Sequence, residues 1–148
     1  MHNTGPAELA GMLFAFIFIL AVLYVPLIFF CLTLQNTLKQ TQPQNRTMSP
    51  GQVWLLLIPI FSLGWGFYVV IQVRDALRRE YQTRDLPVTD DFGFAIGMTM
   101  AGLACGVIIP FLGLFMGIGH LVLWIIYWVK ITGYKNNLMI QSQTLNVR

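Results

Sequence analysis

The sequence predicts an all-α integral membrane protein, a bundle of four transmembrane helices joined by short loops. Hydrophobic residues make up 56% of its 148 residues and charged residues only 10%, with a mean hydropathy of +0.66. Soluble domains usually carry about 25% charged residues. This composition excludes a disordered chain, a basic arm that binds nucleic acid and an ordinary water-soluble enzyme core, and it indicates that lipid surrounds most of the chain.

The spacing of the charged residues divides the chain into spans. Three long stretches carry no charge: 30 residues (9–38), 27 residues (47–73) and 38 residues (92–129). A helix of about 20 apolar residues crosses a bilayer core, so the first two stretches fit one span each. The third would be about 57 Å long as one helix, so we expect a bend at residues 110–113. The predicted spans are residues 9–32, 53–73, 92–109 and 114–131.

The first span (residues 9–32) is apolar on all sides, as a helix surrounded by lipid requires. No basic segment precedes it, and its apolar core exceeds the roughly 7–15 residues of a signal peptide, so we expect a permanent span. Pro26 should bend its second half. The following loop (residues 33–52) is rich in amide side chains and in turn-forming Pro and Gly.

The second span (residues 53–73) begins beside Trp54, whose indole should anchor it at the membrane interface. Pro59 should kink it. The helix is then predicted to continue as a polar extension (residues 74–86) until Leu86-Pro87 ends it. Two oppositely charged pairs four residues apart support this extension: Asp75 with Arg79, and Glu80 with Arg84.

Small residues mark the third span (residues 92–109). Asp90 and Asp91 precede it and are good N-cap residues, whose carboxylates also suit the positive end of a helix. Small residues four apart let two helices approach closely in lipid, so we expect this face to pack on another helix of this chain or of a partner. The helix-packing residues are Gly93, Gly97, Ala101 and Cys105 in one row, and Gly102 and Gly106 in a second.

The fourth span (residues 114–131) ends in an aromatic belt followed by a lysine. Trp124, Tyr127 and Trp128 are expected to lie at the membrane interface, and Lys130 to extend its ammonium into the headgroups. The remaining residues, 134–148, are predicted to form a polar tail.

The basic residues predict an orientation. Four spans place both termini and the 74–86 extension on one side with seven Lys and Arg, against two in the 33–52 loop. The positive-inside rule then predicts both termini in the cytoplasm, although the first span alone favours the opposite insertion. Four arginines of the extension are expected to set this orientation and to lie near anionic lipid headgroups: Arg74, Arg78, Arg79 and Arg84.

Two motifs resemble those of an uncharacterised family of small multi-span bacterial inner-membrane proteins. One is Asn-Arg-Thr-Met-Ser-Pro-Gly-Gln-Val-Trp-Leu-Leu-Leu-Ile-Pro-Ile-Phe at residues 45–61, and the other is Leu-Trp-Ile-Ile-Tyr-Trp-Val-Lys-Ile at residues 123–131, followed by Tyr-Lys-Asn-Asn at 134–137. The resemblance covers about residues 45–138. It implies a helical protein of the bacterial inner membrane and carries no catalytic or binding residues over to this chain.

The preferred function is a non-enzymatic accessory or scaffold subunit of a larger inner-membrane complex. Its partners would be other integral membrane subunits and the lipid bilayer, with no nucleic acid. All charged residues fall outside the cores of the four predicted spans, which argues against a proton-coupled transporter. Cys31 and Cys105 lack the spacing of a metal site, so no metal is expected.

Two alternatives remain open. His120 is the only histidine within a predicted span, and a neutral imidazole can ligate haem iron or the magnesium of a chlorophyll-type pigment. Gly113, Gly117 and Gly119 would leave room for a flat macrocycle, with Trp124 one turn away, but His120 can equally bond to a neighbouring helix. The other alternative is a homo-oligomeric channel or small transporter that uses polar side chains: Ser62, Gln72 and Thr99.

Overall fold

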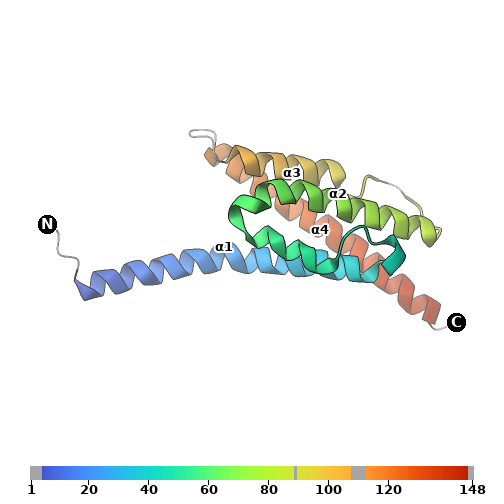
Figure 1. Ribbon diagram of the computed structural model, residues 1–148, viewed down its shortest axis with the longest axis horizontal. Helices are drawn as coiled ribbons and strands as arrows, with labels where there is room; N and C mark the ends of the chain where they lie inside the picture. The colour runs from blue at the N-terminus through green and yellow to red at the C-terminus, as the bar shows by residue number, and fades with distance from the viewer. Residues whose placement is uncertain (1–4, 89, 108–112, 147–148) are drawn as a thin grey trace.

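The computed structural model describes residues 5–88, 90–107 and 113–146, and it is all-α, with no strand in these ranges (Figure 1). The predicted bend at residues 110–113 lies outside the described residues except for Gly113, which begins the last helix. In chain order the elements are α1 (Pro6–Gln40), the short 3₁₀ helices η1 (Pro43–Asn45) and η2 (Pro50–Leu57), α2 (Pro59–Thr83), α3 (Phe94–Gly106) and α4 (Gly113–Asn146).

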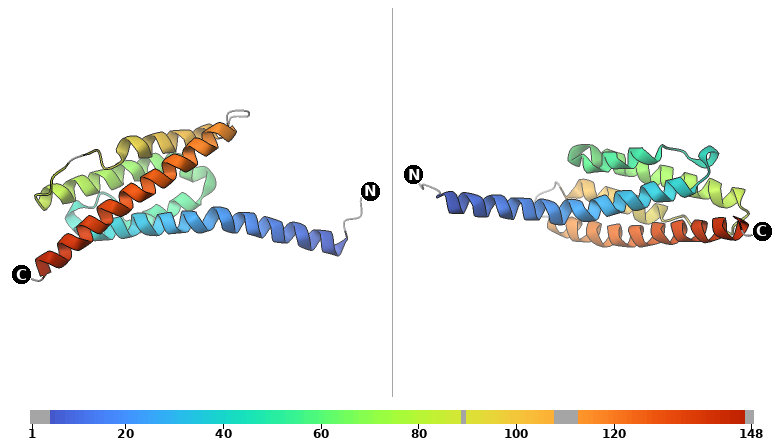
Figure 2. Two further views of the ribbon diagram at one scale, coloured as in Figure 1. Left: turned by 180° about the vertical axis from the view of Figure 1, so that it is seen from behind. Right: turned by 90° about the horizontal axis from the view of Figure 1, so that it is seen from below.

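Helix α1 is longer than the predicted first span. Its 35 residues extend about 52 Å and continue through Pro26, and residues 33–40 are helical although their composition predicts a loop. Every residue from 6 to 21 is exposed, and this outer part of α1 projects beyond the other helices in every view (Figures 1 and 2). The rest of α1 packs into the bundle.

The predicted second span, residues 53–73, is not one helix. Residues 50–57 form η2, which lies along α1, and the chain then reverses at Ile58 into α2 (Figure 1). Ile58 has an extended backbone (φ −85°, ψ 109°) because it precedes Pro59, which disfavours helical geometry before it and offers no N–H. A capping box of Ser49 and Gln52 begins η2.

Helices α3 and α4 form an antiparallel pair (Figures 1 and 2). The 13 residues of α3 extend about 20 Å, whereas the 34 residues of α4 extend about 51 Å. Residues 134–146, predicted as a polar tail, belong to this helix. By length and composition, two of the described helices, α1 and α4, could cross a membrane. That α2 and α3 also cross the membrane, as a four-helix membrane bundle requires, stays a prediction.

The tightly packed core lies toward the ends of α1, α2 and α4. Its buried positions recur every three to four residues along each helix, so that one face of each meets the others. The fully buried side chains include Leu34 and Leu38 of α1, Val53 of η2, Val73 and Leu77 of α2, and Ile131 and Leu138 of α4.

Arg84 shows that the loop after α1 and the extension of α2 lie at the same end of the molecule. Its guanidinium donates to the carbonyl oxygens of Gln40 and Leu138, both at 3.1 Å. The comparison of seven basic residues against two placed these segments on opposite sides, and that assumption is wrong, because the η2–α2 reversal returns the chain to the end it left. We call this the charged end, which contains Lys39, Arg46, residues 74–85, Asp90, Asp91 and Lys130.

Candidate functional site

The charged end is organised around a buried carboxylate. Glu80 is 0% exposed. Its Oε2 accepts hydrogen bonds from the backbone N–H of Gln42 and from Nδ2 of Asn45, both at 2.8 Å, and its Oε1 accepts one from Nε of Arg84 at 2.7 Å. A buried charge is tolerated only when it is paired and hydrogen-bonded, as Glu80 is here. This carboxylate therefore joins the loop after α1 to α2.

Arg46 and Thr47 complete this connection. Arg46 donates to three carbonyl oxygens at the end of α1: Leu38 at 2.8 Å, Lys39 at 3.0 Å and Thr41 at 3.1 Å. The last carbonyls of a helix lack partners within it, so a guanidinium placed there satisfies them. The hydroxyl of Thr47 donates to the carbonyl of Gln72 at 2.7 Å. These contacts indicate a structural network.

Sequence reasoning missed this network. It counted Arg46 only as a charge of the loop and Glu80 with Arg84 only as a surface helix pair. The available signal was an arginine within seven residues of Lys39, at a helix end where unpaired carbonyls need donors.

Asp91 bonds to the first turn of α3, whereas Asp90 bonds to the N–H of Phe92 before the helix, and the N-cap residue itself is Gly93. Asp91 accepts hydrogen bonds from the N–H groups of Gly93 (3.0 Å) and Ala95 (2.8 Å), and the Ala95 bond is the main cause that lowers the pKa of Asp91. Asp90 accepts from Lys130 Nζ at 2.8 Å and from the Tyr134 hydroxyl. Desolvation opposes ionisation of Asp90, but these bonds outweigh it and lower its pKa. Lys130 is therefore ion-paired at this position.

The four aromatic anchors differ in their surroundings. The indoles of Trp54 and Trp128 donate to Gln35 Oε1 at 3.3 Å and to Thr33 Oγ1 at 2.8 Å, and both partners belong to α1. Trp124 packs edge-on against Phe30 with ring centroids 5.4 Å apart. Tyr127 is only 1% exposed, so its ring packs inside the bundle and does not face the surroundings. These rings therefore join α1 to η2 and α4.

The absence of a side chain at Gly97 makes room for the buried Tyr127 ring. A Cβ at Gly97 would lie 2.9 Å from Tyr127 Cε2 and 2.7 Å from Val70 Cγ1, so the missing side chain lets α2, α3 and α4 meet. Ala101 is buried as well. The partners of this small-residue face therefore lie within this chain.

The other small residues predicted to pack do not share one face. Gly106 faces Met116 of α4, and Gly93 lies before α3 with a left-handed backbone (φ 75°) against Tyr127. Cys105 is exposed at the surface, but its thiol lies 3.9 Å from the carbonyl oxygen of Leu63 in α2. At Gly102, no described atom lies within 4 Å of the position that a Cβ would take. Only part of the predicted stripe is therefore in contact with another helix.

The four arginines of the extension divide into two kinds. Arg84 belongs to the Glu80 network, and Arg74 pairs with Asp75 at 2.8 Å while its guanidinium lies 4.4 Å from the centre of the Phe94 ring. Among the described residues Arg78 and Arg79 form no ion pair, and both are exposed. Only these last two therefore present their charge outward in the way expected of residues near lipid headgroups.

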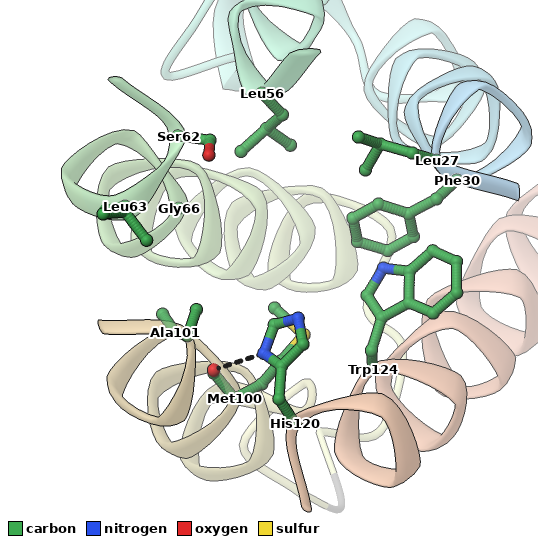
Figure 3. A pocket seen from close by; sticks show the side chains of 11 residues that line it. Leu27, Phe30, Leu56, Ser62, Leu63, Gly66, Met100, Ala101, His120 and Trp124 are labelled. Atoms are coloured by element: carbon green, nitrogen blue, oxygen red, sulfur yellow. Dashed lines mark hydrogen bonds between the residues drawn. The ribbon is translucent and has the colours of Figure 1, made fainter. Parts of the chain in front are cut away.

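His120 borders a cavity of about 190 Å³ between α1, η2, α2, α3 and α4 (Figure 3). Its Nδ1 lies 2.9 Å from the carbonyl oxygen of Met100. A carbonyl only accepts hydrogen bonds, so Nδ1 carries the proton, and a neutral ring then has a lone pair on Nε2. Figure 3 shows this second nitrogen on the side of the ring that faces Phe30 and Trp124, with Leu56 and Ser62 across the cavity.

The cavity by itself is too small to enclose a haem or a chlorophyll-type macrocycle. The exposed lone pair of Nε2 would suit an axial ligand, but the volume is below the roughly 300–1,000 Å³ of pockets for drug-sized ligands. The three glycines expected to leave room for a flat ring do not line the cavity. Gly119 lies against Leu103, Gly113 against Val107, and Gly117 borders the neighbouring groove between α1 and α4.

The polar residues suggested for a channel are not brought together. Ser62 borders the His120 cavity, and Thr99 is exposed on α3. Gln72 lies at the charged end, where its backbone carbonyl accepts from the Thr47 hydroxyl. A continuous polar path through these three residues is therefore not formed within the described part of this chain.

Neither a metal centre nor a known relative indicates a chemistry. Within the described ranges, no group of three His, Cys, Asp or Glu residues is placed to hold a metal ion, and Cys31 and Cys105 are free thiols. No model of a known protein family matches the chain, and no curated protein or solved structure matches it either. The function must therefore be inferred from the charged end and from the exposed outer part of α1.

Proposed function

We propose that the chain is a non-enzymatic accessory subunit of a larger assembly in the bacterial inner membrane, and that the outer part of α1 docks on a helix of another subunit. The observation that carries this proposal is the complete exposure of residues 6–21. This segment is about 24 Å long, most of the thickness of a bilayer core. Apart from Glu8 near its start, it carries no charge.

A row of small residues on this segment supports a helix as the partner. Ala7, Gly11 and Ala15 are four residues apart, a spacing that lets a second helix approach closely in lipid. No described atom lies within 4 Å of the position that a Cβ would take at Gly11. The row is therefore open to a partner, while the bulky residues on the other sides suit lipid chains.

The charged end supports an orientation different from the one the sequence suggested. Lys39 and Arg46 lie beside Arg84, so the basic residues from both the loop and the extension are at one end. The positive-inside rule would place this end in the cytoplasm and the start of α1 on the other side. This orientation agrees with the insertion that the first span favours by itself.

Gly11→Leu tests the docking proposal. A leucine there would separate the two helices, so we expect the partner subunits to be lost when the variant is purified from native membranes in mild detergent. Ala10→Leu is the matched control, because residue 10 points about 100° away from Gly11 on the same turn, and it should keep the partners. Purification of the unaltered chain alone, as a monomer or with only copies of itself, would refute the proposal.

A further inference from the structure

We propose that the cavity beside His120 binds a single phenolic ring that carries an apolar tail, such as a quinol. The volume supports one ring. An apolar cavity of about 150 Å³ is known to hold benzene, and this cavity of about 190 Å³ leaves room for ring substituents. Most of its lining is apolar, including Leu27, Phe30, Leu56 and Trp124.

The polar groups that line the cavity can only accept hydrogen bonds, so they favour a ligand that has a hydroxyl group. His120 uses its Nδ1 proton on Met100, which leaves Nε2 as an acceptor. The hydroxyl of Ser62 donates to the carbonyl of Pro59 at 2.7 Å, which leaves only the lone pairs of its oxygen. Both side chains can then only accept. A phenol or quinol supplies the hydroxyl hydrogens that they need, whereas a quinone, which has only carbonyl oxygens, does not.

A neighbouring groove can hold the tail. This groove, of about 430 Å³, lies between α1 and α4, and three residues border both it and the cavity: Leu27, His120 and Trp124. The rest of its lining is apolar, with Val22 and Pro26 on α1 and Leu121 on α4. Several of these side chains are exposed, so a tail in the groove would remain in contact with membrane lipid. The ring would enter the cavity from that side.

Binding measurements with three probes test the site. Isothermal titration calorimetry on the full chain in detergent micelles, with empty micelles as the blank, would compare a decyl-substituted benzoquinol, the corresponding benzoquinone and 4-decylphenol. We expect the benzoquinol to bind most tightly, since it offers two hydroxyls, 4-decylphenol to bind next, and the benzoquinone to bind at least tenfold more weakly than the benzoquinol. Binding of 4-decylphenol separates a general phenolic site from one that needs both hydroxyls, and either result supports the proposal.

Variants locate the bound hydroxyls. His120→Phe and Ser62→Ala should each weaken benzoquinol binding about tenfold. Ser142→Ala is the matched control, because Ser142 donates to the carbonyl three residues earlier at 2.8 Å, as Ser62 does, but lies away from the cavity. It should bind the benzoquinol like the unaltered chain.

A cavity-filling variant keeps the test valid if His120→Phe disturbs the fold. If His120→Phe lowers the melting temperature, Ala104→Leu fills the cavity from α3 without touching the His120 hydrogen bond, and it should abolish binding of all three probes. Equal affinity for the benzoquinol and the benzoquinone, or unchanged benzoquinol binding in both His120→Phe and Ser62→Ala, would overturn the proposal. The site lies within this chain, so this outcome is independent of the docking partner.

Discussion

Glu80 is the residue on which the charged end depends most. Its buried carboxylate is held by a backbone N–H, an amide and a guanidinium from different parts of the chain. From the sequence, the Glu80–Arg84 pair is visible only as a helix pair, worth about 0.2–0.5 kcal/mol. Its burial depends on the return of residues 42–46 over α2, a long-range contact that no local pattern encodes.

Glu80→Ala should therefore lower the free energy of unfolding by roughly 3–5 kcal/mol, because it removes one partner of a buried ion pair. Arg79→Ala, next to it but exposed, should change stability by less than about 0.5 kcal/mol. Denaturant unfolding of both variants in detergent measures the difference. Similar losses for the two variants would show that Glu80 has no special role.

Asp91 should make the stability of the fold depend on pH in the acidic range. Its folded pKa is lower than the ordinary value of 3.8, so its contribution is fully present above that value and is lost as the pH falls through the lowered pKa. Asp91→Asn should therefore reduce stability at neutral pH and flatten the loss between about pH 5 and pH 2. Melting temperatures across this range test the effect, and parallel curves for the variant and the unaltered chain would contradict it.

At the scale of elements, the sequence located the apolar helices but not the path between them. The four predicted spans fall within regions that are largely helical, since long uncharged stretches identify such segments. Pro59 was expected to kink a span and is instead the first residue of α2, which begins after η2 has ended at Leu57. A proline permits either outcome. The reversal depends on contacts such as the Trp65 indole with the Gln52 carbonyl at 3.0 Å, which spacing alone does not reveal.

Two glycine substitutions on α3 should change the stability of the fold in opposite directions. Gly97→Ala places a methyl group within 2.9 Å of α2 and α4 and should destabilise the fold by about 1–3 kcal/mol. Gly102→Ala, on the same helix but beside open space, should be neutral or stabilise by up to about 1 kcal/mol through helix propensity. Thermal unfolding of the two variants measures both signs. A loss at Gly102 as large as at Gly97 would mean that α3 packs differently.

At the scale of the whole molecule, polarity is separated along the long axis. The charged end contains the buried network and most of the well-packed core, whereas the exposed apolar residues gather on the outer part of α1 and the first half of α4. The sequence predicted the membrane character from these same apolar stretches. An orientation counted from basic residues depends on which loops share a side, and that pairing of loops was not visible in the sequence.

The relative position of residues 44 and 82 tests the central claim most directly. In a chain with Cys31→Ser and Cys105→Ser, the exposed residues Glu8, Gln44 and Gln82 are changed singly to cysteine and labelled with a membrane-impermeant maleimide. We expect Gln44→Cys and Gln82→Cys to be protected in intact spheroplasts and labelled in inverted vesicles, and Glu8→Cys to behave in the opposite way. Labelling of residues 44 and 82 from opposite faces would contradict a single charged end.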